Sequence, residues 1–263
     1  PTDFTRNIIR TRFQPDVEKA LKELFSFDVD VALLLPEERE AYTRQAPSLS
    51  VGNNGADRYT FERFVVGSTN RFAYTAAKKV SEQPGDAYNP LFIYGQSGLG
   101  KTHLLHAIAN RVHQDNPGYR IMYVQSEDFV NEFIDHLRHG KDMQGFRDKY
   151  RLVDLFLMDD VQFIAGKDSS EEELFHTFNT LYEQKKQIVF TSDRPPHEML
   201  RLEQRLRTRF EQGLSVDIQP PDYETRVALL KNKSLEQGIS LPEPVLSYVA
   251  ENITSNVRQI EGV

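Results

Sequence analysis

The sequence contains no cysteine, so this chain can form neither disulfide bonds nor thiolate metal sites. It also lacks an apolar run of about eighteen residues, the length that a membrane-spanning helix needs. No signal-peptide pattern opens the sequence, although it does not begin with methionine either. The net charge of −7 argues against a protein that coats duplex DNA through its overall charge. We therefore expect a soluble, cytoplasmic protein.

Residues 95–102 read Gly-Gln-Ser-Gly-Leu-Gly-Lys-Thr, a complete G-x-x-x-x-G-K-[ST] motif. An apolar stretch at 90–94 predicts a strand before it, and residues 101–114 predict a helix after it, as the motif requires. Backbone N–H groups of such a loop point at phosphates. We expect Lys101 to contact the β- and γ-phosphates and the Thr102 hydroxyl to ligate Mg²⁺. The predicted nucleotide-binding residues here are Gly95, Gln96, Ser97, Gly98, Leu99, Gly100, Lys101, Thr102 and His103.

Strand and helix patterns alternate from Tyr59 to about residue 217. This alternation predicts an α/β fold in which helices flank a parallel five-stranded sheet and the nucleotide lies at the carboxyl ends of the strands. The predicted strands are 90–94, 120–125, 153–158, 187–192 and 213–217. The predicted helices are 68–82, 101–114, 126–138, 143–151, 171–184 and 198–210.

The two ends of the chain have different patterns. Residues 4–35 predict a helix and a strand that are too short to bury a core, so we interpret 1–36 as the remnant of another domain. Residues 37–57 have the composition of a linker. We take 58–219 as the nucleotide-binding base. After Pro220 and Pro221 the pattern is purely helical, with a last helix expected near Ser255, so 220–263 predicts a small, incomplete helical lid.

A second motif is the apolar strand that ends in Asp159 and Asp160. We expect Asp159 to hold Mg²⁺ through water and Asp160 to orient or deprotonate the attacking water. Paired aspartates are also common in turns that follow strands. Because this pair follows a P-loop, we interpret the two motifs as Walker A and Walker B of one nucleotide site.

Three further sites are typical of AAA+ ATPases. Asp193 follows the strand 187–192 and is a candidate sensor beside the γ-phosphate, or an N-cap before the following prolines. An arginine of the segment 205–210 is a candidate finger for the ATP of a neighbouring subunit, since arginine is permanently charged and bidentate. Arg258 is a candidate second sensor that acts in cis. Each arginine also fits a solvated helix face.

Other P-loop classes match the sequence less well. A GTPase needs an Asn-Lys-x-Asp motif, and Asn232-Lys233 lacks the aspartate. We identify neither the basic mobile lid nor the acceptor pocket of a small-molecule kinase. The sequence therefore favours ATP and an AAA+ architecture.

The chain resembles the bacterial DnaA family of chromosomal replication initiators over about residues 58–263. The resemblance is carried by 59–67 with Asn70, and by 89–106, 159–163, 175–179, 191–194, 205–210 and 255–258. Residues 4–35 resemble, more weakly, the end of the family's N-terminal interaction domain. We expect no counterpart of the C-terminal helix-turn-helix domain, so that only the intact protein would read duplex origin boxes.

The resemblance implies a role for several residues. Val65, Val66 and Asn70 would border the adenine of ATP or ADP. Asp193 would be sensor 1, Arg209 the finger that acts in trans, and Arg258 sensor 2.

The resemblance also implies that 126–151 is the helical insertion through which ATP-bound initiators form a right-handed filament. Its second half is basic, although a solvated helix pair would look the same; the basic residues are Arg138, Lys141, Arg147, Lys149 and Arg151. Single-stranded DNA would contact Ile134, Lys167 and Ser170. Asp168 adds negative charge there, and Ser169 stands where many relatives carry arginine, so we expect weaker or differently distributed affinity for the strand.

The implied function is ATP-dependent initiation of DNA replication. The protein would bind Mg·ATP, form a helical oligomer, engage single-stranded origin DNA, and promote origin unwinding and helicase loading. Slow ATP hydrolysis would reset it. The replicative helicase and acidic phospholipids are further implied partners. Alternatives are a helicase loader or an initiator-regulating AAA+ ATPase, a P-loop kinase or metabolic ATPase, and a nucleotide binder without turnover.

Overall fold

The computed structural model describes residues 59–140 and 142–253, all of which belong to one compact unit, residues 48–263. The predictions for the remnant 1–36, the linker 37–57, the helix near Ser255 and Arg258 lie outside the described residues. None of the described helices is long and apolar enough to cross a membrane.

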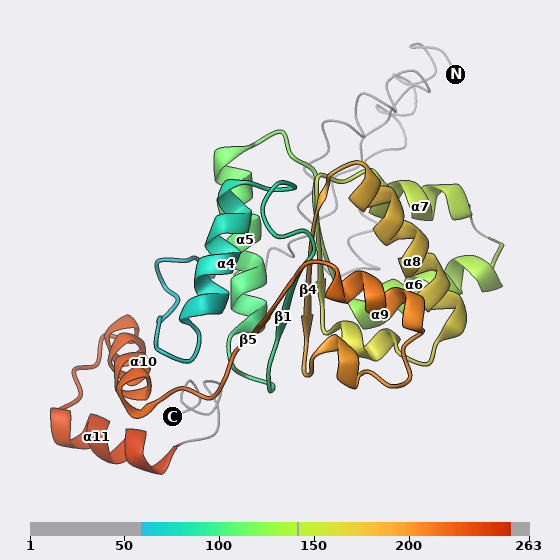
Figure 1. Ribbon diagram of the computed structural model, residues 1–263. Coiled ribbons are helices and arrows are strands. Elements are labelled where there is room, and N and C mark those ends of the chain that lie inside the picture. Colours follow the sequence, from blue (N-terminus) through green and yellow to red (C-terminus); the bar gives the residue numbers. More distant parts are fainter. Residues whose placement is uncertain (1–58, 141, 254–263) are drawn as a thin grey trace, which may run out of the picture. The chain divides into compact units, whose positions relative to one another are not determined.

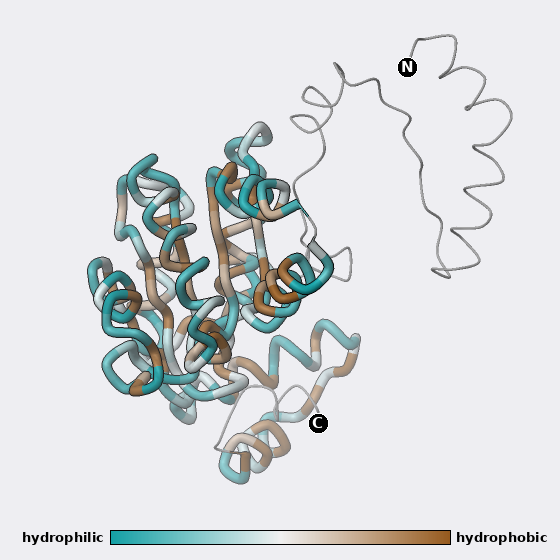
Figure 2. The backbone as a smooth tube through the Cα atoms, turned by 90° about the vertical axis from the view of Figure 1, so that its right-hand side faces the viewer, coloured by the Kyte–Doolittle hydropathy of each residue, from teal (hydrophilic) through white to brown (hydrophobic). Residues whose placement is uncertain are grey.

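Five parallel strands form one sheet in the order β2-β3-β4-β1-β5 (Figure 1). The strands are β1 (Leu91–Tyr94), β2 (Ile121–Gln125), β3 (Leu155–Asp159), β4 (Gln187–Ser192) and β5 (Leu214–Asp217). Every residue of β3 and β4 is buried, because helices cover both faces of the sheet and both strands have neighbours on each side. Figure 2 shows brown, hydrophobic backbone segments in the interior of this unit. The predicted fold class is confirmed.

Helices cover the two faces of the sheet and enclose two hydrophobic cores (Figure 1). One face carries α4 (Arg71–Glu82) and α5 (Lys101–Asp115). The other carries α6 (Ser126–Arg138), α7 (Met143–Arg151), α8 (Asp168–Glu183), α9 (Gln204–Glu211) and the 3₁₀ turns η2 (Val161–Ile164) and η3 (Pro196–Glu198). The loops that follow β1, β3 and β4 therefore meet at one edge of the sheet, where parallel α/β proteins bind their ligands.

Two helices, α10 (Tyr223–Glu236) and α11 (Glu243–Asn252), follow the sheet and pack on each other around Leu230, Leu246 and Ala250. Asp222 caps α10 by accepting from the Thr225 N–H at 2.8 Å. Its other carboxylate oxygen accepts from the Ser68 hydroxyl at 2.5 Å, which ties this pair of helices to the segment before α4. The division into base and lid at residue 220 stays a prediction.

The predicted helix 198–210 is wrong in its first half, because α9 begins only at Gln204. Met199 and Leu202 are both buried, but they lie in a turn between η3 and α9 and not in a helix. The Glu171 carboxylate, itself fully buried, accepts the backbone N–H groups of Glu203 and Gly166, each at 2.7 Å. This contact joins residues distant in the sequence, so no local helical pattern could reveal it. Smaller differences are that α4 begins at Arg71 instead of residue 68, and α8 at Asp168 instead of 171.

Candidate nucleotide-binding site

The P-loop connects the carboxyl end of β1 to the N-terminus of α5. Gly98 and Gly100 have φ angles of 79° and 97°, in the left-handed region that glycine adopts without a steric penalty. A Cβ on Gly100 would also lie 3.0 Å from the ring of Phe64. The Lys101 ammonium group donates to the carbonyl oxygens of Gly95 at 2.7 Å and Gln96 at 3.0 Å. Its positive charge is thereby held inside the loop.

A cavity of about 400 Å³ lies against the P-loop, within the usual size range of small-molecule sites. Its walls come from the P-loop, the segment before α4, and α10. The predicted site residues in its lining are Val65, Asn70, Ser97, Gly98, Leu99, Gly100, Lys101, Thr102, His103 and Asp160. Among the predicted nucleotide-site residues, those outside the lining are Val66, Gly95, Gln96, Asp159, Asp193 and Arg209.

The segment before α4 is held in place by side-chain contacts. Asn70, which is 8% exposed, donates from its amide to the Val65 carbonyl oxygen at 3.0 Å and accepts from the Gly67 N–H at 2.8 Å. Val66 is outside the cavity lining and 38% exposed, and its predicted place beside the adenine stays a prediction. Nε2 of His103 lies 2.8 Å from the Thr60 carbonyl oxygen. The loop conformation thus depends on Asn70.

Asp159 is the centre of a hydrogen-bond network that joins three elements. The carboxylate is 3% exposed. Oδ2 accepts from the Thr102 hydroxyl of the P-loop at 2.7 Å and from the Tyr123 hydroxyl of β2 at 3.1 Å, and Oδ1 accepts from the Thr191 hydroxyl of β4. A buried carboxylate needs such donors, since an unpaired one would carry a large desolvation penalty.

The donor set at this point fits Mg²⁺. Thr102 and Asp159 present hard oxygen atoms next to one another. Within the part of the chain that the structure describes, no group of three or more His, Cys, Asp or Glu side chains could hold a metal ion. Mg²⁺ is typically held by one or two protein oxygens together with substrate phosphates and water. The site therefore suits Mg²⁺ that arrives with a nucleotide.

Asp160 has the backbone conformation of a left-handed turn, with φ at 52° and ψ at 51°. Its N–H donates to the Thr191 hydroxyl oxygen at 3.0 Å, and its carboxylate accepts from the Gln162 amide at 3.2 Å. Burial raises the pKa of this carboxyl, and the negative charges of Asp159 and Asp193 add to the shift. A raised pKa makes the carboxylate a better proton acceptor, as the predicted role requires.

Asp193 follows β4 and forms a bidentate ion pair with its neighbour, at 2.9 Å and 2.8 Å from the Arg194 guanidinium. The Arg194 hydrogen bonds lower the pKa of Asp193. Its carboxylate is therefore engaged outside the cavity, and its sensor role stays a prediction.

The sequence predicted a helical lid, but it did not identify which α10 residues line the cavity. Five α10 side chains line it at helical spacing: Thr225, Leu229, Asn232, Lys233 and Glu236. Their spacing of four, three, one and three residues marks one helix face, so the signal was present in the sequence. Tyr59, Arg63 and Phe64 were also missed as lining residues.

The other predicted site residues lie elsewhere. Arg209, half-buried on α9, donates to the Gln212 side chain at 3.0 Å. Ile134 packs partly buried against the core beneath α6, and Lys167 is exposed just before α8. Ser170 is only 2% exposed, so this conformation does not support its predicted contact with DNA, which stays a prediction.

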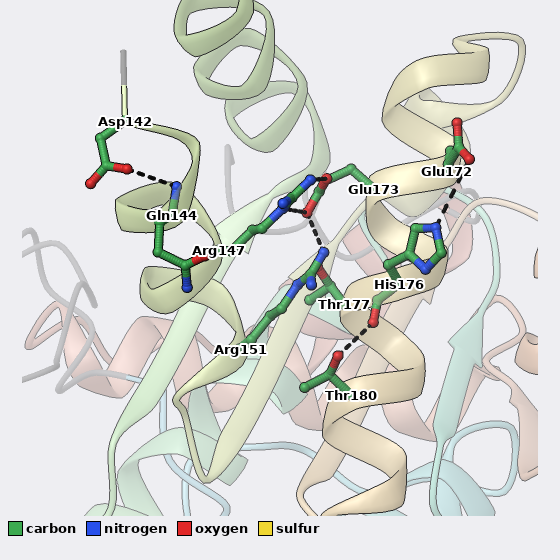
Figure 3. Close-up of polar contacts among 9 residues, drawn as sticks. All are labelled: Asp142, Gln144, Arg147, Arg151, Glu172, Glu173, His176, Thr177 and Thr180. Carbon is green, nitrogen blue, oxygen red and sulfur yellow. Dashed lines mark hydrogen bonds and ion pairs between the residues drawn. The ribbon is translucent and has the colours of Figure 1, made fainter.

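Three of the basic residues in the second half of the insertion form ion pairs, and Figure 3 shows two of them. Arg147 and Arg151 of α7 both reach the Glu173 carboxylate on α8, which is 5% exposed. Lys149 pairs with Glu132 of α6 at 2.7 Å. For these three cations, the interpretation as a solvated helix pair therefore agrees better with the structure than a phosphate-binding surface does.

The comparisons with known proteins agree with this geometry. Residues 56–217, more than half of the chain, match the family model described as the bacterial DnaA ATPase domain. Over 270 residues the chain is 48% identical to the chromosomal replication initiator protein DnaA of Caldanaerobacter subterraneus subsp. tengcongensis, which covers 100% of this chain and 60% of that protein. The chain belongs to the bacterial DnaA family. It spans about 60% of the length of this curated DnaA relative.

Solved DnaA structures share the fold. Domain III of the Thermotoga maritima DnaA has a TM-score of 0.75 and 49% identity, over 80% of this chain and 86% of that one. A DnaA initiator bound to AMPPCP and single-stranded DNA has a TM-score of 0.73 and 44% identity, over 78% of this chain and 63% of that one. The resemblance predicted from the sequence is confirmed, and the helicase-loader and kinase alternatives lose their support.

Proposed function

We propose that this chain binds Mg·ATP in the cavity and acts as the ATP-dependent switch of a replication initiator. The observation that carries the proposal is the hydrogen bond between Thr102 and Asp159, which brings the predicted Mg²⁺ ligands of the P-loop and of β3 together. A relative of 44% identity that binds AMPPCP, an analogue of ATP, supports the choice of nucleotide.

In this proposal the P-loop N–H groups and Lys101 bind the phosphates, and Val65 lies toward the base. Thr102 and Asp159 hold Mg²⁺, which offsets phosphate charge when it is bound. Asp160 accepts the proton of the attacking water, and the slow hydrolysis that follows resets the switch. The raised pKa of Asp160 and its place in the cavity lining support this assignment.

We further propose that Arg209 acts on the nucleotide of a neighbouring subunit. It is outside the lining of its own cavity, as a finger that acts in trans should be. ATP-loaded subunits would then form the helical oligomer of the family, hold single-stranded origin DNA with Lys167 and Ile134, and promote origin unwinding and helicase loading. A DnaA relative with bound single-stranded DNA supports the choice of partner.

Sedimentation with ATP or ADP, with and without single-stranded DNA, tests this function. The wild-type chain should form oligomers with ATP and remain monomeric with ADP. Arg209→Ala should bind ATP with nearly unchanged affinity but stay monomeric, whereas the matched change Arg207→Ala on the same helix should assemble. The Asp160→Asn variant should form oligomers with ATP, and these oligomers should persist after the wild type has hydrolysed its ATP and dissociated. An ATP-indifferent wild-type monomer would contradict the proposal, and loss of ATP binding in Arg209→Ala would contradict the role of that residue.

A further inference from the structure

A tyrosine hydroxyl contacts the predicted metal-binding carboxylate from a neighbouring strand. Tyr123 lies in β2, which pairs with β3 so that Tyr123 is level with Leu157 and Gln125 is level with Asp159. From there the Tyr123 hydroxyl donates to Asp159 Oδ2 at 3.1 Å, the same oxygen that accepts from Thr102. No motif in the sequence marks this residue, because its contact depends on strand register.

The ring of Tyr123 is held by aromatic packing. His106 of α5 lies against it with ring centroids 4.4 Å apart and an interplanar angle of 31°. Tyr59 stacks on His106, with centroids 5.4 Å apart and an angle of 18°. Three elements that are distant in the sequence thus fix the direction of one hydroxyl group. Rigid packing of this kind keeps a supporting hydrogen bond in place.

Tyr123 is one of three hydroxyl donors to the Asp159 carboxylate. The other two hydroxyl donors have additional tasks. Thr102 is itself a predicted metal ligand, and Thr191 also accepts the N–H of Asp160.

We propose that Tyr123 is a positioning residue for the nucleotide-bound Mg²⁺. Its hydroxyl orients the Asp159 carboxylate toward the P-loop, and the stacked rings of His106 and Tyr59 hold that hydroxyl in place. The inference rests on the proposed role of Asp159 as a holder of the metal. Outer hydrogen-bond partners of metal ligands typically contribute about 10-fold to 100-fold in metal affinity.

The test measures how Mg²⁺ strengthens binding of AMPPCP to the full chain, by calorimetry in EDTA and over a Mg²⁺ series. Tyr123→Phe removes one oxygen atom. In this variant, we expect the Mg²⁺ concentration that gives half of the gain in AMPPCP affinity to rise about 10-fold relative to the wild type. The affinity for AMPPCP in EDTA should stay within about twofold of the wild type, because the phosphate contacts are intact. His106→Leu, which keeps the hydroxyl but loses the stacked ring, should give a smaller shift in the same direction and does not depend on the folding of Tyr123→Phe.

The matched control is Tyr150→Phe, because Tyr150 is also buried and donates to a carboxylate, that of Glu132 at 2.6 Å, outside the site. It should shift neither quantity. Asp159→Asn should abolish most of the Mg²⁺ effect. If it does so while Tyr123→Phe matches the wild type, the inference is overturned and the metal assignment stands. If Asp159→Asn keeps the full Mg²⁺ effect, the metal assignment fails and takes the inference with it.

Discussion

Thr191 connects the two aspartates of the candidate site, and its removal should be costly. It is fully buried at the end of β4. Its hydroxyl donates to the Asp159 carboxylate and accepts the Asp160 N–H at 3.0 Å. Thr191→Val keeps nearly the same shape and removes both bonds. The substitution therefore isolates the hydrogen bonds from the packing.

The expected loss of stability follows from what each partner is left with. The Asp160 N–H would lose its hydroxyl acceptor, and leaving a buried donor unpaired costs about 1–3 kcal/mol. Asp159 would lose one charged hydrogen bond but keep those from Thr102 and Tyr123, so this contribution lies at the low end of about 1.5–3 kcal/mol. Together we expect the free energy of unfolding to fall by about 2.5–4.5 kcal/mol.

Urea denaturation without nucleotide measures this loss. Thr177→Val is the matched control, because Thr177 is also fully buried but its hydroxyl oxygen accepts only a long bond, 3.3 Å from Arg151 Nε. That variant should lose less than about 1 kcal/mol. ATP hydrolysis should also fall in Thr191→Val, since the Asp160 backbone is no longer held. If Thr191→Val is no less stable than Thr177→Val, the argument that this hydroxyl organises the site is refuted.

Two further predictions concern stability outside the aspartate pair. Glu173→Ala should lower the free energy of unfolding, measured by urea denaturation, by about 3 kcal/mol, because it leaves the largely buried Arg151 without its carboxylate partner (Figure 3). Arg111→Ala removes an exposed ion pair and should cost less than about 1 kcal/mol. Equal losses in the two variants would contradict this prediction. The Ser68 hydroxyl, and then Thr225, lower the pKa of Asp222 to about 2. Because the pKa of Asp222 is lower in the folded protein, its ionised carboxylate stabilises the fold at pH values above the unfolded pKa of about 3.9. This stabilisation is lost as the pH falls toward 2. Hydrogen exchange should therefore show α10 protected less in Asp222→Ala than in the wild type at pH 6, with the difference narrowing below pH 4; a pH-independent difference would refute the charge argument.

The sequence predicted those parts of the site whose chemistry is local. The P-loop and the Asp159-Asp160 pair are runs of consecutive residues, and the strand–loop–helix pattern around them places them at one sheet edge. Thr191 lay inside a predicted strand, but its two hydrogen bonds depend on how β3 and β4 pair. The contact between Tyr123 and Asp159 could not be predicted for the same reason, because it depends on how β2 and β3 pair. Contacts between neighbouring strands depend on the register of their pairing, and a single sequence does not reveal that register.

The sequence left two interpretations of the insertion open, because charge counted along the chain does not show which side chains pair. Arg147, Lys149 and Arg151 look like a basic surface only while their partners are ignored. Those partners, Glu132 and Glu173, come from α6 and α8, on either side of α7 in the sequence. These ion pairs set two carboxylates against three basic side chains, which reduces the positive charge that a phosphate backbone would meet. Among the other cations of this region, Arg138 and Lys167 are exposed.

The first turn of the insertion is nevertheless bound to the nucleotide site. Ser126, the first residue of α6, is fully buried, and its hydroxyl donates to the Asp160 carbonyl oxygen at 2.6 Å. The Asp160 N–H is held in turn by Thr191. One peptide segment therefore joins the carboxylate pair to the helix that carries Ile134. Asp160 therefore belongs both to the hydrogen-bond network of the candidate site and to the anchor of α6.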